Sequence, residues 1–183
     1  MSLEHREALV DHIVETQPAL SVFVRDLHTD LTAGDWDLVS YSFERGFEAL
    51  WDCARAEVSG LLDRPLLLLW RQSVELSIKS AIFYIDGKIG IKSGHDVESL
   101  FDQLLKIRSR WGYHDDDDLA LSVKSTIALV QSFDPFADRF RYPTDNGGKP
   151  YVGIALDLDE LFEAHWIITT WCEGAVLELK GDI

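Results

Sequence analysis

The chain has 183 residues, of which 46% are hydrophobic and 11% aromatic, a composition typical of a folded protein and not of a disordered one. One domain with a short appendage accommodates this length. The 17 basic and 32 acidic residues give a formal net charge of −15, which repels nucleic acid over most of the surface and leaves only a local basic patch for any such contact.

The amino-terminal residues predict a helical appendage over residues 1–35, ahead of a main domain over residues 36–183. One helix is expected over residues 3–16. A second short helix is expected after Pro18, which suits a first helical turn and precedes apolar residues at helical spacing. The amino terminus lacks the apolar core of a signal peptide, and no stretch has the roughly 18 uninterrupted apolar residues of a membrane span. We therefore expect a cytoplasmic protein that does not contact a membrane.

The main domain opens with two predicted helices. A capping box that ends at Asp35 precedes the first, whose apolar stripe continues to a break between Gly60 and Asp63. Pro65 lies in the first turn of the second helix, which is apolar all round near its start. This second helix is therefore expected to be central, and a loop rich in glycine ends it.

Three more helices and one irregular segment complete the pattern. A helix that ends near Arg110 carries basic residues at its carboxyl end, where cations interact favourably with the helix dipole. Another helix follows the aspartates 115–118. Residues 139–156 depart from the helical period and, with their glycine turn, predict a small β-hairpin. Asp157 or Asp159 can cap the last helix.

These elements predict an all-α protein, an antiparallel helical bundle of five or six helices with a small β-hairpin before the last helix. The two cysteines, Cys53 and Cys172, lie on apolar stripes and are expected to be reduced core residues. His165 also lies on such a stripe, as a hydrogen-bonded core histidine. The other side chains expected to face inward include Phe47, Leu50, Trp70, Val74, Ile78, Leu100, Leu104, Leu119, Val123 and Ile127.

Three short patterns follow one another in the main domain. They are RQSVELSIK at residues 71–79, GHDVESL at residues 94–100 and RFRYP at residues 139–143, and each lies at a predicted helix start, face or end. In this order they resemble the HEPN superfamily (higher eukaryotes and prokaryotes nucleotide-binding), over roughly residues 36–180. The resemblance implies a small helical bundle.

The resemblance also implies that several motif residues are structural. In that superfamily the equivalents of Glu75 and Lys79 face the next helix or a dimer partner, and that of His95 caps or packs a helix entry. Tyr142 and Pro143 belong to the last pattern. The residues themselves leave an alternative for Glu75 and Lys79, because a plain i,i+4 ion pair on one helix has the same spacing and is worth only about 0.3–0.5 kcal/mol.

The function implied by the resemblance is that of a prokaryotic stress, toxin–antitoxin or defence protein. Such a protein would bind RNA or nucleotide without a cofactor, form a homodimer and act beside a cognate protein from a neighbouring gene. Many HEPN proteins are metal-independent endoribonucleases that use an arginine and a histidine four to six residues apart, and Arg108 and His114 have that spacing. The imidazole would act as general base toward a ribose hydroxyl, and the guanidinium would stabilise charge on the phosphate.

Two alternatives to this catalytic pair stay open. The same spacing relates Arg6 and His12, as chance allows in this composition. Arg108 can also be a helix-terminal cation and His114 a solvated loop residue. The sequence therefore does not decide whether the chain is an enzyme, and the alternative function is a non-catalytic protein–protein interaction module with an acidic surface.

A basic patch that binds RNA or another anion is expected where the predicted hairpin approaches a helix exit, formed by Arg108, Arg110, Arg139 and Arg141. Arg139 and Arg141 alternate with two aromatic residues, so on a strand both guanidinium groups share one face. That face either binds anions or is the outer side of a hairpin anchored by its rings. No metal site is expected at residues 115–118, because consecutive side chains point in different directions and acidic residues are favoured at a helix start.

Overall fold

The computed structural model describes residues 3–20, 31–90 and 94–181. The chain divides into two compact units, residues 1–33 and residues 34–183. The first unit contains helix α1 (Leu3–Leu20), which continues through Pro18 instead of ending before it. The helix predicted after Pro18 falls largely on residues 21–30, which lie outside the described residues. No helix in the described part of the chain is both long and apolar enough to span a membrane.

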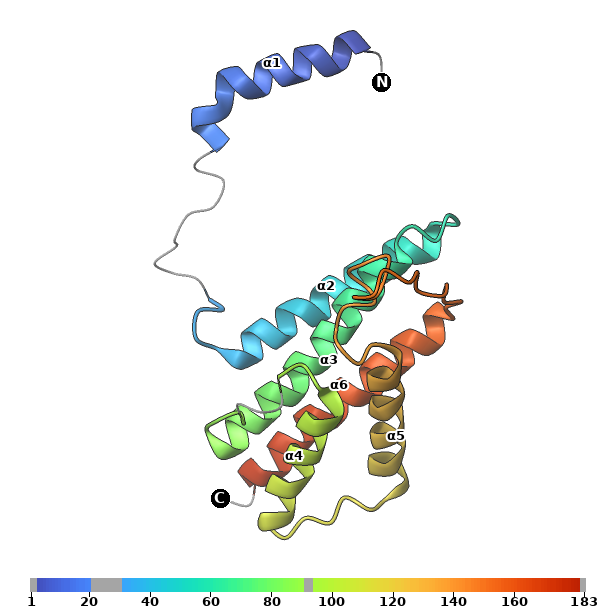
Figure 1. Cartoon of the computed structure of the whole chain (residues 1–183). Coiled ribbons are helices and arrows are strands. Elements are labelled where there is room, and N and C mark those ends of the chain that lie inside the picture. Colours follow the sequence, from blue (N-terminus) through green and yellow to red (C-terminus); the bar gives the residue numbers. More distant parts are fainter. Residues whose placement is uncertain (1–2, 21–30, 91–93, 182–183) are drawn as a thin grey trace. The chain divides into compact units, whose positions relative to one another are not determined.

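The second unit is a bundle of five helices, and α3 (Asp63–Asp86) lies at its centre (Figure 1). It contacts α2 (Trp36–Ala56), α4 (Val97–Arg110) and α6 (Leu158–Gly181), and α5 (Asp118–Phe133) packs against α4 and α6. Every residue of α3 from Ser73 to Ile78 is buried, so the helix has no solvent face in its middle. The prediction of an all-α bundle with this helix at its centre is confirmed.

Helix α2 is shorter than its apolar stripe predicts. Asp35 caps its start, with Oδ1 accepting the backbone N–H groups of Asp37 and Leu38 at 2.9 and 3.1 Å. The helix ends because Glu57 has an extended backbone, with φ −102° and ψ 116°. Val58, predicted to continue the stripe, is therefore fully exposed.

Two side chains expected in the core are exposed for reasons of helical phase. Cys53 directly precedes the buried Ala54, and adjacent helical residues point about 100° apart, so the two cannot share one face. Leu119 stands in the same relation to the buried Ala120 near the start of α5. Cys172 is buried as expected, and burial raises the pKa of its thiol.

The remaining predicted core is confirmed in the bundle, where Leu50 is half-buried and packs against the fully buried side chains. His165 is a core residue, with Nε2 lying 2.9 Å from Ser73 Oγ and its ring against Phe47. Burial lowers the pKa of His165 to about 4, so its ring is neutral at pH 7. The buried members of the predicted core are Phe47, Trp70, Val74, Ile78, Leu100, Leu104, Val123 and Ile127.

The predicted β-hairpin is wrong. The described residues contain no strand, and the segment between α5 and α6 has one isolated antiparallel bridge, Thr144 with Pro150. Pro143 and Pro150 supply no backbone N–H, so a ladder cannot extend through them. The loop is fixed instead by Asp145, whose Oδ1 accepts the N–H groups of Gly147 and of Lys149.

Candidate functional site

Arg108, one of the two predicted catalytic residues, is a buried part of the bundle. Each of its three guanidinium nitrogens donates to a protein acceptor. Nε donates to both oxygens of Asp115 at 3.0 Å, Nη1 to the Ala175 carbonyl at 2.9 Å, and Nη2 to Glu178 at 2.8 Å. The guanidinium also lies over the ring of Trp171. This set of partners leaves Arg108 poorly placed to bind a phosphate.

His114, the other half of the predicted pair, lies exposed on the connection between α4 and α5. It is not among the partners of Arg108, which is held by Asp115 from the same connection. Asp117 caps α5, with Oδ1 accepting two backbone N–H groups at 2.9 Å. Among the described residues, no group of three or more acidic, histidine or cysteine side chains could hold a metal ion.

Arg139 and Arg141 mainly stabilise the loop that carries them. Arg139 donates to the carbonyls of Phe133 and Val152 at 3.1 and 3.2 Å. Arg141 Nε donates to the carbonyl of Ala137 at 2.6 Å, and its guanidinium remains exposed. These contacts favour the structural interpretation of Arg139 and leave Arg141 accessible.

Tyr142 and Pro143, the last two residues of the third motif, contribute mainly backbone contacts. The exposed Tyr142 ring lies under the guanidinium of Arg141, with 5.8 Å between the guanidinium carbon and the ring centroid. The Pro143 carbonyl accepts the N–H of Tyr151 at 3.1 Å, which closes the base of the loop.

The four arginines of the expected basic patch lie along different parts of α3. Arg110 pairs with Asp86 in the last turn of the helix at 2.8 Å. The segment 139–143 lies nearer the start of the helix: Arg64 donates to the Tyr142 carbonyl at 2.7 Å, and the Arg139 N–H donates to Asp134, which lies 3.6 Å from Arg71. Because a helix rises 1.5 Å per residue, Asp86 is about 22 Å along α3 from Arg71 and about 33 Å from Arg64. The patch predicted from residues 108–141 is therefore not assembled.

A different polar cluster forms on α3, where Arg71, Glu75 and Lys79 follow at intervals of four and so share one face. Glu75 accepts from Lys79 Nζ at 2.6 Å and lies 3.4 Å from Arg71 Nη1. The Glu75 side chain is only 2% exposed, so this is a buried ion pair and not a surface one. Lys79 is 16% exposed, and its ammonium lies at the edge of the cluster.

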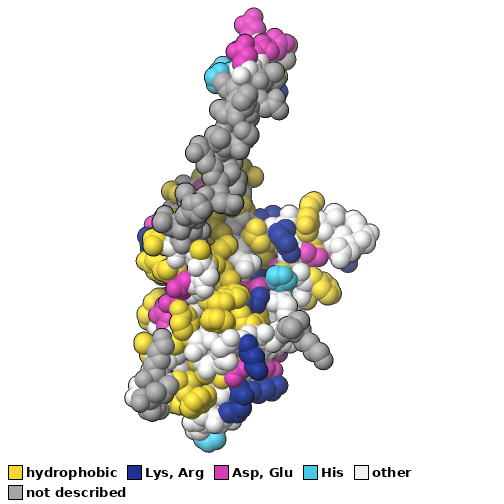
Figure 2. Space-filling model, turned by 90° about the vertical axis from the view of Figure 1, so that its left-hand side faces the viewer, with side chains coloured by type: hydrophobic (Ala, Val, Ile, Leu, Met, Phe, Trp, Pro, Cys, Tyr) yellow, Lys and Arg dark blue, Asp and Glu magenta, His cyan; other side chains and the backbone are white. Residues whose placement is uncertain are grey.

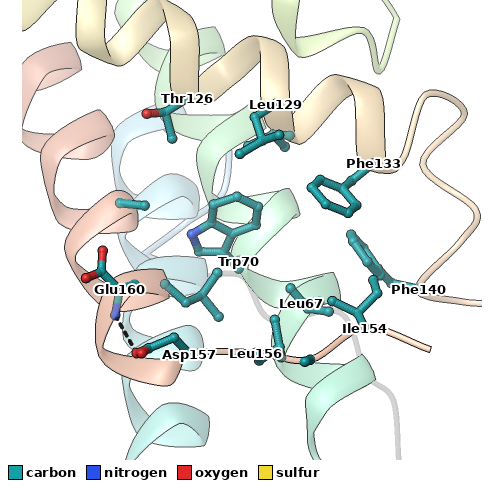
Figure 3. A pocket seen from close by; sticks show the side chains of 14 residues that line it. Leu67, Trp70, Thr126, Leu129, Phe133, Phe140, Ile154, Leu156, Asp157 and Glu160 are labelled. Atoms are coloured by element: carbon teal, nitrogen blue, oxygen red, sulfur yellow. Dashed lines mark hydrogen bonds between the residues drawn. The ribbon is translucent and has the colours of Figure 1, made fainter. Parts of the chain in front are cut away.

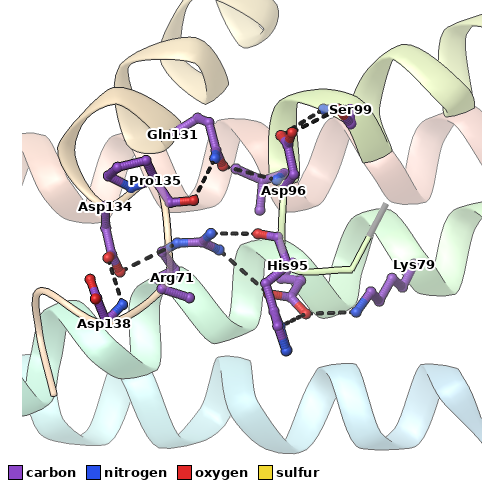
Figure 4. A network of polar contacts seen from close by, with 12 residues as sticks. Arg71, Lys79, His95, Asp96, Ser99, Gln131, Asp134, Pro135 and Asp138 are labelled. Carbon is purple, nitrogen blue, oxygen red and sulfur yellow. Dashed lines mark hydrogen bonds and ion pairs between the residues drawn. The ribbon is translucent and has the colours of Figure 1, made fainter. Parts of the chain in front are cut away.

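The loop before α4 brings His95 onto this cluster. Its Nδ1 lies 2.9 and 3.1 Å from the two oxygens of Glu75, and its backbone carbonyl accepts from Arg71 Nη2 (Figure 4). Because a carboxylate paired with two cations only accepts hydrogen bonds, Nδ1 must carry the proton. In the neutral ring Nε2 is therefore the nitrogen that carries no proton, and the side chain is 66% exposed.

The end of α5 closes the cluster from the other side. Asp134 is 1% exposed, with Oδ2 3.6 Å from Arg71 Nε and Oδ1 accepting the N–H groups of Asp138 and Arg139. Gln131 accepts the N–H of Val97 at 3.1 Å and so ties α5 to the start of α4. The cluster thus joins α3 to the start of α4, the end of α5 and the loops beside them (Figure 4).

Four charged side chains of the cluster pair with one another. Arg71 and Lys79 are in ion-pair contact with Glu75 and Asp134, and these four charges sum to zero. Burial lowers the pKa of the Arg71 guanidinium; the charges of Glu75, Asp134 and Asp96 oppose that shift, and the charge of Arg141 adds to it. The His95 ring and the Lys79 ammonium contact the same Glu75 oxygen, at the exposed edge of the cluster.

Asp134 and Gln131 are the members of the cluster that no sequence motif indicated. Asp134 follows the last residue of α5 and precedes Pro135, which is a common turn signal and gives no sign of burial. The sequence contains no signal for either residue, because the burial of Arg71, which creates the need for a further carboxylate partner, is seen only in the structure. Comparisons with protein-family models, curated proteins and solved structures found no match to this chain.

Proposed function

We propose that this chain is a cytoplasmic, HEPN-like protein that binds RNA or nucleotide and cleaves RNA without a metal ion, with His95 as the general base. The observation that carries the proposal is the contact of His95 Nδ1 with the buried Glu75, which orients a basic Nε2 toward solvent. A buried carboxylate that fixes an exposed imidazole is a common arrangement for general-base catalysis. The setting we infer is a prokaryotic stress, toxin–antitoxin or defence system.

The reaction proposed is an internal transesterification. His95 Nε2 takes the proton of a ribose 2′-hydroxyl, the 2′ oxygen bonds to phosphorus, and the bond from phosphorus to the 5′ oxygen breaks. The leaving oxygen takes a proton from solvent, which gives a 2′,3′-cyclic phosphate and a 5′-hydroxyl. The Lys79 ammonium, which contacts the same Glu75 oxygen as His95, would stabilise the charge on the phosphate.

The test is cleavage of single-stranded and structured RNA in the presence of a chelator. We expect His95→Gln to lower the rate by about 10²–10⁴-fold, the usual contribution of a general base, while His114→Gln leaves it unchanged. Lys79→Ala should weaken binding and cleavage together. Loss of cleavage in His114→Gln but not in His95→Gln would assign catalysis to the pair predicted from the sequence, Arg108 and His114. No RNA binding by the wild-type protein at low salt would refute the proposal.

A second candidate function is a non-catalytic protein interaction module, either as a homodimer or with a protein from a neighbouring gene. Its support is the charge of −15 together with exposed hydrophobic side chains on two adjacent helices. Tyr41 of α2 is 57% exposed and Tyr84 of α3 is 41% exposed, and one face of the bundle shows a broad hydrophobic area (Figure 2). Exposed hydrophobic side chains that gather on one face are a feature of protein interaction sites.

Sedimentation equilibrium tests this second candidate. A dimer that Tyr41→Glu dissociates, and that Leu177→Glu on the exposed side of α6 leaves intact, would place the interface on α2 and α3. A monomer at all concentrations, with no protein partner recovered from the products of adjacent genes, would count against it.

A further inference from the structure

A polar groove of about 140 Å³ lies where α2, α3 and α6 meet, three helices that pack against one another (Figure 1). It differs from the cavity beside Trp70, whose wall is formed mainly by apolar side chains such as Leu67 and Phe133 (Figure 3). No side chain of the polar cluster around His95 lines the groove, so the proposal below does not depend on the proposed function. The polar lining of the groove consists of Asp37, Ser40, Glu44, Ser77, Ser80 and Glu173.

Helical periodicity places these side chains on two facing surfaces. Asp37, Ser40 and Glu44 are three and four residues apart, so they share one face of α2. Ser77 and Ser80 face them from α3, where Ser77 Oγ donates to Glu44 Oε1 at 3.0 Å. A helix rises 1.5 Å per residue, which puts Asp37 about 10 Å from Glu44 along α2. A carboxylate thus stands at each end of the strip that α2 contributes.

Two oxygen atoms of the groove lack a partner. Ser80 is 5% exposed, and its hydroxyl forms no hydrogen bond among the described residues. Glu44 Oε1 accepts from Ser40 and Ser77, whereas Glu44 Oε2 accepts from no described residue. Neither Ser80 Oγ nor Glu44 Oε2 is sealed from solvent, so a ligand in the groove can reach both. Because buried polar groups normally have partners, these two atoms indicate a site for a hydrogen-bond donor.

The charges of the groove select a cation. Asp37, Glu44 and Glu173 are its carboxylates, and no basic side chain lines it among the described residues. Burial raises the pKa of the Glu44 carboxyl, against the hydrogen bond from Ser77, and the charge of Glu173 raises it further. A cation beside Glu44 would offset both its lost hydration and this repulsion. The cation is not a directly bound metal ion, because no group of three acidic, histidine or cysteine side chains in the described part of the chain could hold one.

We propose that the polar groove binds a short-chain diamine as its dication. One ammonium group donates to Glu44 Oε2 and Ser80 Oγ, and the other meets the exposed carboxylates of Asp37 and Glu173. Two charges fit because carboxylates stand at both ends of the groove. A primary ammonium fits better than a quaternary one, since both unpartnered oxygens need an N–H donor. The groove is smaller than the roughly 300–1,000 Å³ of drug-sized sites, so only a few carbon atoms fit between the two nitrogens.

Four probes test the proposal by calorimetric titration into the full chain, at about 0.15 M salt to screen the general negative charge of the surface. They are 1,4-diaminobutane, 1-aminobutane, 1,4-butanediol and magnesium chloride. We expect the diamine to bind at least about tenfold more tightly than the monoamine or magnesium, and the diol not to bind, because charge-assisted hydrogen bonds are the strong ones. The monoamine has one charge, magnesium has two charges without N–H donors, and the diol has the shape without the charge.

Three variants place the site. Glu44→Gln should weaken diamine binding at least about tenfold, the effect of removing a charged hydrogen-bond partner, and Ser80→Ala should weaken it about fivefold. Asp52→Asn is the matched control and should leave the affinity unchanged, because Asp52 is exposed on the same helix, carries the same charge and does not line the groove. Glu44→Gln and Ser80→Ala add no atoms to the groove, so both variants should fold.

The proposal is overturned if the diamine does not bind saturably, if magnesium binds as tightly, or if Glu44→Gln and Asp52→Asn weaken binding equally. Equally tight binding of the monoamine would also overturn it, and would assign the groove to a lone ammonium group such as the lysine side chain of a protein partner.

Discussion

Replacing Arg108 with methionine tests whether this residue holds the bundle together or is free for chemistry. The guanidinium is 5% exposed and donates to Asp115, which is 9% exposed, and to Glu178 and the Ala175 carbonyl. Methionine fills a similar volume without any of these donors. The Asp115 carboxylate would then be buried without its cation, and the carbonyl would lose its partner.

The expected cost is large. Removing one partner of a buried ion pair costs about 3–5 kcal/mol. In a chain of this size each kcal/mol lowers the melting temperature by roughly 2–4 °C, so the Arg108→Met protein should melt about 6–20 °C below wild type. Arg110→Met is the matched control. Its side chain is 62% exposed and, among the described residues, pairs with Asp86, which corresponds to at most about 1 kcal/mol.

Calorimetry or circular dichroism at pH 7 measures both variants. Adding Asp115→Asn to Arg108→Met should recover part of the loss, because the double variant has no uncompensated carboxylate. If Arg108→Met melts no lower than Arg110→Met, the ion pairs of Arg108 contribute nothing measurable and the residue is free to act as a catalytic cation.

Two further predictions concern buried titratable groups. Burial lowers the pKa of His165 from 6.5 to about 4, so between these pH values only the unfolded chain binds this proton. The unfolding free energy of wild type should therefore fall by up to about 3 kcal/mol, relative to that of His165→Gln, as the pH drops from 6.5 to 4. Urea titrations at several pH values measure both unfolding free energies, and a difference between wild type and His165→Gln that does not change with pH would contradict this prediction. Burial also raises the pKa of Glu44, against the hydrogen bond from Ser77, so ionised Glu44 destabilises the folded state above pH 4.5. Glu44→Gln should therefore raise the melting temperature at pH 7 and have little effect near pH 4, and a lower melting temperature at pH 7 would refute this.

The helices could be predicted because their cause is local. Apolar residues at intervals of three and four, and aspartates that cap a helix, act within one or two turns of chain. Phe47, Val74 and Leu104 are buried for this reason. Where the local signal is ambiguous by one position, as at Cys53, the partner elements decide the phase of the helix.

The polar contacts could not be predicted in the same way, because their partners come from distant parts of the chain. Arg108 looks like a solvated cation at a helix end until Glu178 of α6 is placed beside it. His95 and Glu75 were expected only to pack or pair, and neither the tautomer of His95 nor the burial of Asp134 follows from residue spacing. The arginines expected to form one patch are separated along α3, and residue spacing in the sequence does not show this separation.

The last turn of α5 has a consequence for how the molecule would respond to substitution. Val130 and Phe133 line an apolar cavity beside Trp70, while Gln131 and Asp134, the residue that caps the helix end, contact the polar cluster. Backbone hydrogen bonds make one helical turn a stiff unit. We therefore expect a substitution that displaces Phe133 to displace Asp134 as well and to alter its contact with Arg71. The end of α5 thus connects an apolar wall to a buried ion pair, so a substitution in either is expected to affect the other.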